Sequence, residues 1–466
     1  MRSTRTKLIA SIGPSSSKPH VVEQMARLGV TGFRVNFAHG DEKVWSEYVD
    51  IVREVEKRTG RPLALIGDLV GASVRLGEVD KPLTLRAGDL AYIVLSEKGC
   101  SEKREIPLPN PRVFYSIDVG DIIVMDDGRV RLSVIEKRGT RITVRAITDA
   151  RITSRKALVV QGKEFELPSL SQRDIDNVRF AVDKGFDYIG LSYVKRAEDI
   201  ETLRGLLEDL GAPEIGIIAK IETRSAVENL EKIVDVTDVV LVARGDLGMV
   251  FGLEKVPWLQ TRIVTVARRR GKPVIVATQL LESMLENPVP TRAEVNDIVT
   301  AVKEGVDALM LTGETSIGRY PIEAVDWLRR VVEYAESMQP PVRIEVEGDA
   351  TIRFAKGVVA LAEDTSATLL VYTMRGNLPR AIAAERPRVP VYAGAKSLRV
   401  ARKLSILWGI EPIPLEAQSY SEGVEKLLAL LCREGYIGIG ENVLESFRIS
   451  ATEQHIVLKK VTSCPP

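Results

Sequence analysis

The chain has few cysteines and few histidines, and both shortages restrict its chemistry. Among 466 residues there are three cysteines, Cys100, Cys432 and Cys464, which lie far apart and form no CxxC pair. We therefore expect neither a disulfide framework nor a zinc site, and a reducing, cytoplasmic location fits. The three histidines, at positions 20, 39 and 455, are also scattered. No GxSxG sequence accompanies them, which disfavours a hydrolase built on a histidine base.

An excess of charge and long apolar runs are missing as well. The 65 Lys and Arg residues balance 64 Asp and Glu residues, which leaves a net charge of +1. This balance gives no general field for nucleic acid or for an anionic membrane surface. No stretch holds roughly 18 consecutive apolar residues, and the charged first residues contain no signal-peptide core. GxxxxGK[ST] is also absent, which excludes a P-loop enzyme. We expect no nucleic acid and no membrane as partners.

What the sequence does contain is eight short, β-branched apolar runs, each followed, directly or after an insertion, by a helical pattern. Continuous apolar strands alternating with helices indicate a parallel sheet that is covered on both faces. Eight such units in about 240 residues are typical of an α/β (β/α)8 TIM barrel. The expected strands are residues 8–12, 32–35, 63–66, 188–191, 215–219, 239–242, 274–277 and 308–311.

The barrel pattern is interrupted once and is followed by a second α/β unit. Between residues 68 and 170 short alternating strands appear, with hairpin turns at 126–128 and 137–140. They predict an inserted β-barrel lid domain at 72–168. We expect a discontinuous catalytic barrel at 1–71 and 169–340 and a C-terminal α/β regulatory domain at 341–466. The strands expected in the last domain are 368–372, 389–393, 411–414 and 455–460.

Nearly every expected barrel strand ends in a polar or charged residue. Chemistry in this fold sits at the carboxyl ends of the strands, and charged groups are rarely buried unless they are paired or coordinate a ligand. We therefore expect these residues to meet at one mouth of the barrel. They are Arg34, Asn36, His39, Asp68, Arg75, Ser192, Lys220, Glu222, Arg244, Gly245, Asp246, Thr278, Gln279, Thr312 and Glu314.

The residue types in this set favour a small, phosphorylated, metal-chelating substrate. Glu222 and Asp246 supply the oxygen ligands that suit Mg²⁺, which keeps water or substrate oxygens as further ligands. Lys220 is two residues from Glu222, so on a strand both side chains face the same side. Its ammonium could neutralise a transferring phosphoryl group or an enolate.

Other groups in the set could bind anions, although simpler roles remain open. Arg34 and Arg75 could clamp phosphates through paired hydrogen bonds. The consecutive amides of Gly245 and Asp246, at a helix start, could seat a carboxylate or phosphate. The simpler roles are a structural pair of Arg244 with Asp246, an ordinary Lys220–Glu222 ion pair, a strand-end hydroxyl at Thr278 and a helix-start contact at His39.

Seven stretches resemble the pyruvate kinase family in content and in order. The match runs from about residue 5 to 335 and continues more weakly beyond. The stretches are 7–14 (KLIASIGP), 33–40 (FRVNFAHG), 217–222 (IIAKIE), 242–248 (VARGDLG), 277–284 (ATQLLESM), 290–294 (PTRAE) and 310–315 (MLTGET).

The resemblance implies phosphoryl transfer from phosphoenolpyruvate to ADP, giving pyruvate and ATP in glycolysis. Glu222 and Asp246 would hold Mg²⁺ or Mn²⁺. Lys220 would stabilise the phosphoryl group in flight, and Arg34 would contact it from the opposite side. The substrate carboxylate would be bound by Gly245, Asp246 and Thr278.

The resemblance also implies a nucleotide site and a moving lid. Asn36, His39 and Arg75 would face the nucleotide, and Lys156 would reach it from the inserted domain. That domain would close over the site and exclude water. Thr278 would lie on the face where the enolate is protonated.

The chain departs from the family around the monovalent-cation site, where Asn36 and Asp68 would be ligands. Members that need K⁺ usually carry Ser where this chain has Ala38. They also read Asp-Thr-Lys-Gly-Pro-Glu-Ile-Arg where residues 68–75 read DLVGASVR, which puts Ser73 in the place of a Glu. We expect weak or absent dependence on K⁺.

For the C-terminal domain, the resemblance implies a phosphorylated allosteric effector and a homotetramer. The candidate effector loop contains Thr373, Arg375 and Gly376, and an ordinary strand–helix turn is the alternative. The strand at 455–460 would suit pairing between subunits.

Two other functions remain to be weighed against this one. A Mg²⁺-dependent lyase or mutase acting on phosphoenolpyruvate or oxaloacetate would share the metal carboxylates but would not need a lid or Arg75. An inactive scaffold or RNA-binding protein should lack the strand-end groups. This chain retains Lys220, Glu222, Asp246 and Thr278.

Overall fold

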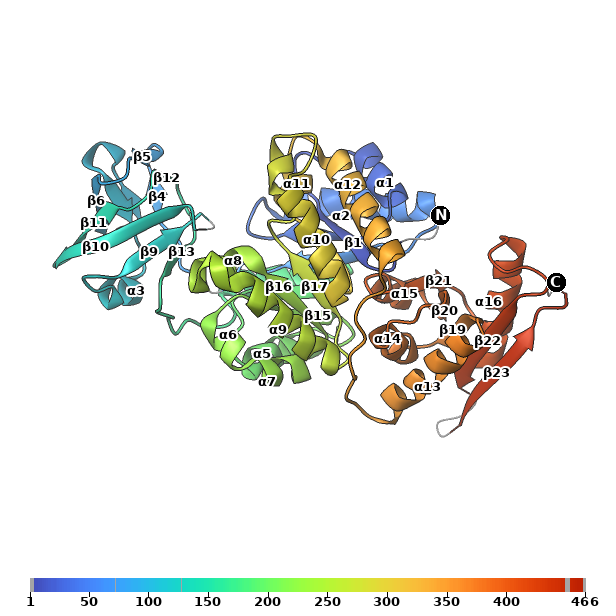
Figure 1. Ribbon diagram of the computed structural model, residues 1–466. Helices are drawn as coiled ribbons and strands as arrows, with labels where there is room; N and C mark the ends of the chain where they lie inside the picture. Colours follow the sequence, from blue (N-terminus) through green and yellow to red (C-terminus); the bar gives the residue numbers. More distant parts are fainter. Residues whose placement is uncertain (1–3, 72, 127, 449–452, 464–466) are drawn as a thin grey trace.

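The computed structural model describes residues 4–71, 73–126, 128–448 and 453–463. Figure 1 shows three bodies in a row, with a β domain at one end, the barrel in the middle and an α/β domain at the other end. Cys464 and the turn residue Asp127 lie outside the described residues. Within the described residues, no helix is both long and apolar enough to span a bilayer.

The middle body is a closed barrel of eight parallel strands in the order β1-β18-β17-β16-β15-β14-β3-β2. Every strand-to-strand register in the barrel is parallel, as between β15 and β16, where Lys220 pairs with Leu241. This confirms the predicted fold, and the strand bounds agree with the prediction to within one or two residues. The strands are β1 (Lys7–Ser11), β2 (Val30–Asn36), β3 (Ala64–Asp68), β14 (Tyr188–Leu191), β15 (Gly216–Ile221), β16 (Val239–Ala243), β17 (Val274–Ala277) and β18 (Ala308–Leu311).

Helices surround the barrel and bury their apolar faces against the strands. Several begin at side-chain caps that fix the path of the chain. Asp41 caps one helix, and Ser171 and Thr291 form capping boxes at two others. The helices are α1 (Pro19–Arg27), α2 (Glu42–Thr59), α4 (Gln172–Asp183), α5 (Ala197–Asp209), α6 (Arg224–Glu228), α7 (Leu230–Val236), α8 (Arg244–Phe251), α9 (Val256–Arg269), α10 (Arg292–Glu304), α11 (Gly313–Ser316) and α12 (Pro321–Met338).

The inserted β domain, called the lid here, has a sheet in the order β13-β9-β10-β11-β6-β8 and its own apolar core. Met125 pairs with Val130 and Arg138 with Arg141, so both predicted hairpins are present. The elements are β4 (Glu78–Val79), β5 (Leu83–Leu85), β6 (Leu90–Val94), β7 (Lys98–Gly99), β8 (Glu105–Pro107), α3 (Pro111–Ser116), β9 (Ile122–Met125), β10 (Val130–Arg138), β11 (Arg141–Ala146), β12 (Ala150–Ile152) and β13 (Leu158–Val160).

The C-terminal body is a five-stranded sheet in the order β21-β20-β19-β22-β23, with helices packed against it. The last strand, β23, is antiparallel to β22 and forms an edge of the sheet. The strand β22 was not predicted from the sequence. The elements are α13 (Ala350–Asp364), β19 (Thr368–Thr373), α14 (Asn377–Ala384), β20 (Val391–Ala395), α15 (Leu398–Leu404), β21 (Ile410–Pro414), α16 (Tyr420–Arg433), β22 (Asn442–Arg448) and β23 (Gln454–Lys460).

The C-terminal body closes the amino-terminal end of the barrel, opposite the predicted site. Ile406 is fully buried and joins an apolar cluster with Ile9 and Tyr188 on the barrel strands. Arg402 donates from Nε to both carboxylate oxygens of Glu56 at 2.8 and 3.1 Å. This packing leaves the opposite mouth, at the carboxyl ends of the strands, for the chemistry.

Candidate active site

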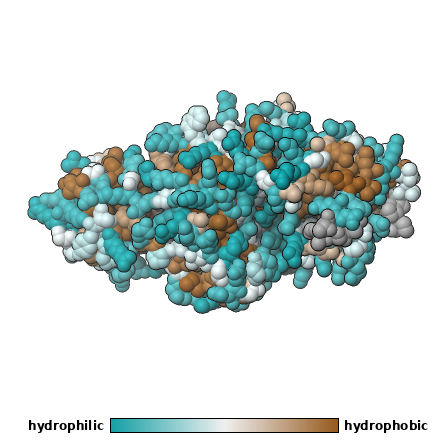
Figure 2. All heavy atoms as spheres, turned by 90° about the horizontal axis from the view of Figure 1, so that it is seen from below, coloured by the Kyte–Doolittle hydropathy of each residue, from teal (hydrophilic) through white to brown (hydrophobic). Residues whose placement is uncertain are grey.

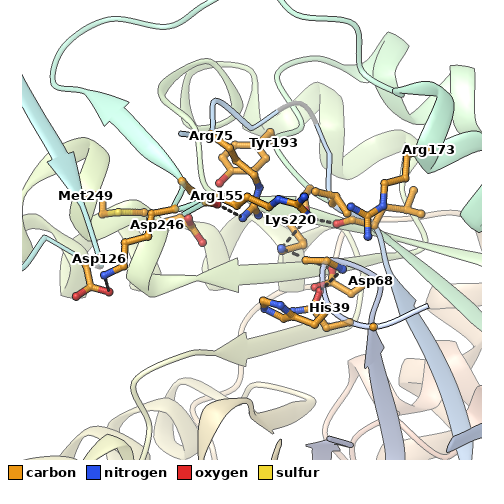
Figure 3. Close-up of a pocket in the computed structure, with 18 of the residues that line it drawn as sticks. His39, Asp68, Arg75, Asp126, Arg155, Arg173, Tyr193, Lys220, Asp246 and Met249 are labelled. Carbon is orange, nitrogen blue, oxygen red and sulfur yellow. Dashed lines mark hydrogen bonds and ion pairs between the residues drawn. The ribbon is translucent and has the colours of Figure 1, made fainter. Parts of the chain in front are cut away.

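A cavity of about 820 Å³ lies between the carboxyl ends of the barrel strands and the lid. Figure 3 shows its side chains pointing inward from both bodies. Of the residues predicted from sequence, those lining it are Arg34, Asn36, His39, Asp68, Arg75, Ser192, Lys220, Asp246 and, from the lid, Lys156. Glu222 and Thr278 do not line this cavity directly, but each contacts a group beside it, as described below.

Lys220 lies in the middle of the barrel mouth among three oxygen-bearing side chains. Its Nζ donates a hydrogen bond to Ser192 Oγ at 2.7 Å and lies 3.6 Å from Asp68 Oδ1 and 3.5 Å from Glu222 Oε2. Burial alone would lower the pKa of Lys220, but the charges of Asp68 and Glu222 raise it above its ordinary value. Lys220 is therefore a fixed, largely buried positive charge.

Glu222 and Asp246 form a buried carboxylate pair beside this lysine. Glu222 Oε1 accepts a hydrogen bond from the Tyr193 amide at 2.6 Å. Glu222 Oε2 is buried and has no hydrogen-bond partner among the described residues. Burial, with the nearby charge of Asp246 adding to it, raises the pKa of Glu222 to about 8, and burial also raises the pKa of Asp246. A hard cation between the two carboxylates would relieve this repulsion and satisfy the unpaired oxygen, so the pair fits Mg²⁺.

The metal fit needs ligands from outside the protein. Within the described residues there is no group of three or more His, Cys, Asp and Glu side chains placed to hold a metal ion. Two carboxylates alone match the preference of Mg²⁺ for one or two protein carboxylates, with substrate oxygens and water completing the shell.

Arg34 is held in place by Asp68. Its Nε donates to Asp68 Oδ2 at 2.9 Å, a second nitrogen contacts the same oxygen, and Nη1 donates to Ser11 Oγ at 3.0 Å. Burial would raise the pKa of Asp68, but the charges of Arg34 and Lys220 bring it below its ordinary value. Asp68 thus stays ionised and orients both cations towards the cavity.

Thr278 lies next to the first turn of α8. Its Oγ1 accepts a hydrogen bond from the Gly245 amide at 2.8 Å. The backbone of Thr278 is left-handed, with φ 68°, as is that of Gln279, with φ 52°. Such backbone geometry costs free energy and persists where the surroundings enforce it.

Arg244 is the group that enforces this geometry. Its guanidinium donates to the Thr278 carbonyl at 3.1 and 2.7 Å and to the Gln279 carbonyl at 2.9 Å. Its carboxylate partner is Asp297 on α10. A structural pair of Arg244 with Asp246, which the sequence left open, is therefore replaced by a pair with Asp297.

The lid side of the cavity is lined by basic groups. Arg75 donates from Nε to Ser73 Oγ at 3.0 Å and from Nη1 to the Arg155 carbonyl at 3.1 Å. Lys156 forms an ion pair with Asp126 at 2.7 Å. Partial burial, together with the positive charges of Arg75, Arg34 and Arg173, lowers the pKa of His39. Asn36 turns its side-chain oxygen towards the Ala38 amide, at 3.0 Å.

Two basic residues of the cavity were not identified from the sequence. Arg173, in the first turn of α4, lines the cavity and donates to the Phe37 carbonyl at 3.0 Å. Arg155 lies beside Lys156 on the lid. The helix start after Ser171 was a usable signal for Arg173, whereas no sequence pattern distinguished Arg155 from the other arginines of the lid.

The predicted effector loop lies in the C-terminal body, after β19. Thr373 Oγ1 accepts a hydrogen bond from the Gly376 amide at 2.8 Å, and Gly376 adopts the left-handed backbone with φ 91°. Arg375 is exposed. Thr373, Arg375 and Gly376 do not line the barrel-mouth cavity.

Fold and site together define a TIM-barrel enzyme whose cavity brings cationic side chains and buried carboxylates together under a β lid. Comparison with known proteins narrows this class. The family described as pyruvate kinase, barrel domain, matches residues 3–325, and the one described as pyruvate kinase, alpha/beta domain, matches residues 353–450. The chain belongs to the pyruvate kinase family and is a glycolytic phosphotransferase of that family.

Individual relatives agree over nearly the whole length. A pyruvate kinase from Pyrobaculum aerophilum is 41% identical over 432 residues, which covers 91% of this chain and 92% of the relative. A pyruvate kinase from Aeropyrum pernix is 38% identical, and the match covers 94% of this chain and 95% of the relative. The crystal structure of pyruvate kinase from Pyrobaculum aerophilum superposes with a TM-score of 0.86 at 38% identity, covering 98% of this chain and 100% of that chain.

Proposed function

We propose that the barrel-mouth cavity transfers the phosphoryl group of phosphoenolpyruvate to ADP around a Mg²⁺ or Mn²⁺ ion held by Glu222 and Asp246. The observation that carries this proposal is the buried Glu222 Oε2, which lies 3.5 Å from the Lys220 ammonium but has no hydrogen-bond partner among the described residues. A metal ion on the two carboxylates would supply a Lewis acid for the substrate oxygens.

Lys220 and Arg34 act on the transferring group. Both are partly buried cations held beside Asp68, so their charge needs no rearrangement when the phosphoryl group passes. Lys220 stabilises the charge that develops on that group, and Arg34 binds its oxygens from the other side.

The first turn of α8 receives the carboxylate of the substrate. The amides of Gly245 and Asp246 lie at the positive end of the helix, and the Gly245 amide would exchange its bond to the Thr278 hydroxyl for one to the carboxylate. Thr278 also holds the position from which the enolate is protonated.

The nucleotide occupies the lid side of the cavity. Here cationic side chains outnumber acidic ones, as suits the phosphates of ADP and ATP. The residues assigned to the nucleotide are Asn36, His39, Arg75 and Lys156, together with Arg155 and Arg173. The lid closes on this side and excludes water, so that transfer is faster than hydrolysis.

We place the lid at 72–168, the barrel at 1–71 and 169–340, and the regulatory domain at 341–466.

We also propose that the enzyme needs little or no K⁺. Of the ligands expected for a monovalent cation, the Asn36 side chain bonds to the Ala38 amide and Asp68 is engaged by Arg34 and Lys220. Ala38 brings no oxygen from its side chain, and the Ser73 hydroxyl is paired with Arg75.

The quaternary state and the regulation are proposals of the same kind. A homotetramer is supported by the edge strand β23, on which Ile456 and Leu458 are 40% and 46% exposed. Figure 2 shows apolar side chains gathered at the end of the molecule that holds the C-terminal body. The loop with Thr373, Arg375 and Gly376 is the proposed site of a phosphorylated effector. The three widely spaced cysteines suit a reducing cytoplasm.

A coupled assay tests the central proposal. Pyruvate should form from phosphoenolpyruvate only when ADP and either Mg²⁺ or Mn²⁺ are present. Pyruvate formation that proceeds equally after removal of divalent metal would contradict the assignment of Glu222 and Asp246. Pyruvate formation without ADP would favour a lyase or a hydrolase.

A further inference from the structure

We infer that Ser192 is a positioning residue that fixes the ammonium of Lys220 without neutralising its charge. The inference rests on the role proposed above for Lys220. Ser192 directly follows β14, its side chain is 3% exposed, and it lines the same cavity as Lys220.

The lysine lies between two carboxylates, but its shortest contact is to neither of them. Its Nζ lies 3.6 Å from Asp68 and 3.5 Å from Glu222, both beyond an ordinary hydrogen bond, but 2.7 Å from Ser192 Oγ. A charge-assisted bond to either carboxylate would be stronger than a bond to a neutral hydroxyl. Without the hydroxyl, the ammonium would move into a hydrogen bond with Asp68 or Glu222. That carboxylate would then neutralise the charge of Lys220.

The hydroxyl itself has only one orientation open to it. A serine hydroxyl carries one proton, and that proton is donated to the Leu69 carbonyl at 2.8 Å. Only the lone pairs of Ser192 Oγ remain, so it accepts from Lys220 and cannot donate into the cavity. The other two N–H groups of Lys220 are shared between the carboxylates of Asp68 and Glu222 and the cavity that Lys220 lines.

The Leu69 carbonyl is held by the strands and helix around it. The Leu69 amide donates to the Gly190 carbonyl at 2.9 Å, and the amides of Val70 and Gly71 donate to Asp174 Oδ1 at 3.1 and 3.2 Å. Asp174 is fully buried in the capping box of α4. A connected series of bonds therefore runs from the start of α4 through the loop after β3 to the catalytic ammonium.

Ser192→Thr and Ser192→Val form the decisive pair of variants. Both add the same bulk, so crowding against the loop after β3 is common to the two, but only threonine keeps the acceptor. We expect Ser192→Val to turn over about 10- to 100-fold more slowly than Ser192→Thr, since a misplacement of about 1 Å at a catalytic group can cost about 100-fold. The KM values for phosphoenolpyruvate and ADP should change far less than kcat.

Ser192→Ala, which cannot crowd its neighbours, should lose kcat in the same way as Ser192→Val. Thr315→Val is a matched control, because Thr315 is a buried residue whose hydroxyl donates to the Ser11 carbonyl at 2.8 Å but does not line the cavity. It should keep its kcat. Equal turnover in Ser192→Thr and Ser192→Val, or an unchanged kcat in Ser192→Ala, overturns the inference.

Failure of this inference differs from failure of the proposed function. If Lys220→Met turns over normally, the role of Lys220 is wrong and that of Ser192 falls with it. If Lys220→Met is inactive while Ser192→Ala is normal, only the positioning role is wrong.

Discussion

The ammonium of Lys220 lies 3.5 Å from Oε2 of Glu222, two residues further along the chain at the end of β15. The two-residue spacing places both side chains on the inner face of the barrel mouth. One strand end thus presents a fixed cation for the phosphoryl group and a carboxylate for the metal ion. Removing either charge should disturb a different step.

Glu222→Gln should weaken metal binding. It keeps the size of the side chain but removes the charge that draws a divalent cation. Loss of an outer partner of a metal ligand already costs about 10- to 100-fold in affinity, so loss of the ligand's charge should cost at least that. Mn²⁺ binding measured by electron paramagnetic resonance is the test. Glu286→Gln, at an exposed pair with Arg319, should bind Mn²⁺ like the unchanged chain. Equal affinity in both variants would remove Glu222 from the metal site.

His39 should titrate below the ordinary histidine value of about 6.5. Partial burial and the charges of Arg75, Arg34 and Arg173 lower its pKa. Its contribution to stability should be complete above about pH 6.5 and should shrink as the pH falls from there towards the lowered value, because the unfolded chain takes up the proton first. Bound ADP phosphates should raise the pKa again.

NMR of labelled imidazoles can measure the pKa of His39 directly, because the chain has only three histidines. His39→Gln identifies the resonance. A His39 pKa at or above 6.5 in the free enzyme would contradict the cationic surroundings described here.

Turnover should be the same in K⁺, Na⁺ and tetramethylammonium buffers of equal ionic strength. Ala38 and Ser73 leave the expected monovalent site without a hydroxyl and a carboxylate. The combined Ala38→Ser and Ser73→Glu variant should gain a dependence on K⁺. If the turnover of the unchanged enzyme rises strongly with K⁺, other oxygens must complete the monovalent-cation site.

The bond between Arg402 and Glu56 should contribute to stability but not to activity. Arg402→Ala leaves the Glu56 carboxylate, whose side chain is 4% exposed, without its main partner. We expect a loss of about 2–3 kcal/mol in the free energy of unfolding, measured in urea. Pyruvate formation should be unchanged, because the pair lies at the far end of the barrel.

Arg399→Ala on the same helix is the matched control. Arg399 pairs with Glu214 on the surface, where both side chains are more than 40% exposed, and such pairs contribute about 0–1 kcal/mol. If the free energy of unfolding falls equally in both variants, the contact with buried Glu56 stabilises the protein no more than the surface pair does.

The barrel and its site could be predicted from the sequence because the signals there are local and repeated. Each strand is a short apolar run, and residues such as Lys220 and Asp246 lie near the carboxyl end of a strand or shortly after it. The strands of the lid and β22 were harder to predict from the sequence. The lid contains strands of two or three residues, and β22 mixes polar and charged residues with apolar ones.

The parts of the site that sequence reasoning missed, residues as well as contacts, depend on how distant segments pack together. Arg155 belongs to the cavity because the lid folds over the barrel, and Arg244 chooses Asp297 because α10 passes beside the loop after β17. The hydrogen bond from Lys220 to Ser192 joins residues 28 positions apart. Spacing along the chain gives no sign of such pairs, whereas packing of the strands creates them.

The most direct test of the account is a single-turnover measurement of ATP formation from phosphoenolpyruvate, ADP and Mg²⁺, comparing the unchanged enzyme with Lys220→Met. Loss of one preorganised charge should cost about 3–4 kcal/mol of transition-state stabilisation, which slows transfer by about 10²- to 10³-fold or more. Mn²⁺ binding should persist in the variant, because Glu222 and Asp246 remain. A Lys220→Met enzyme that forms ATP at nearly the normal rate would contradict the account at its centre.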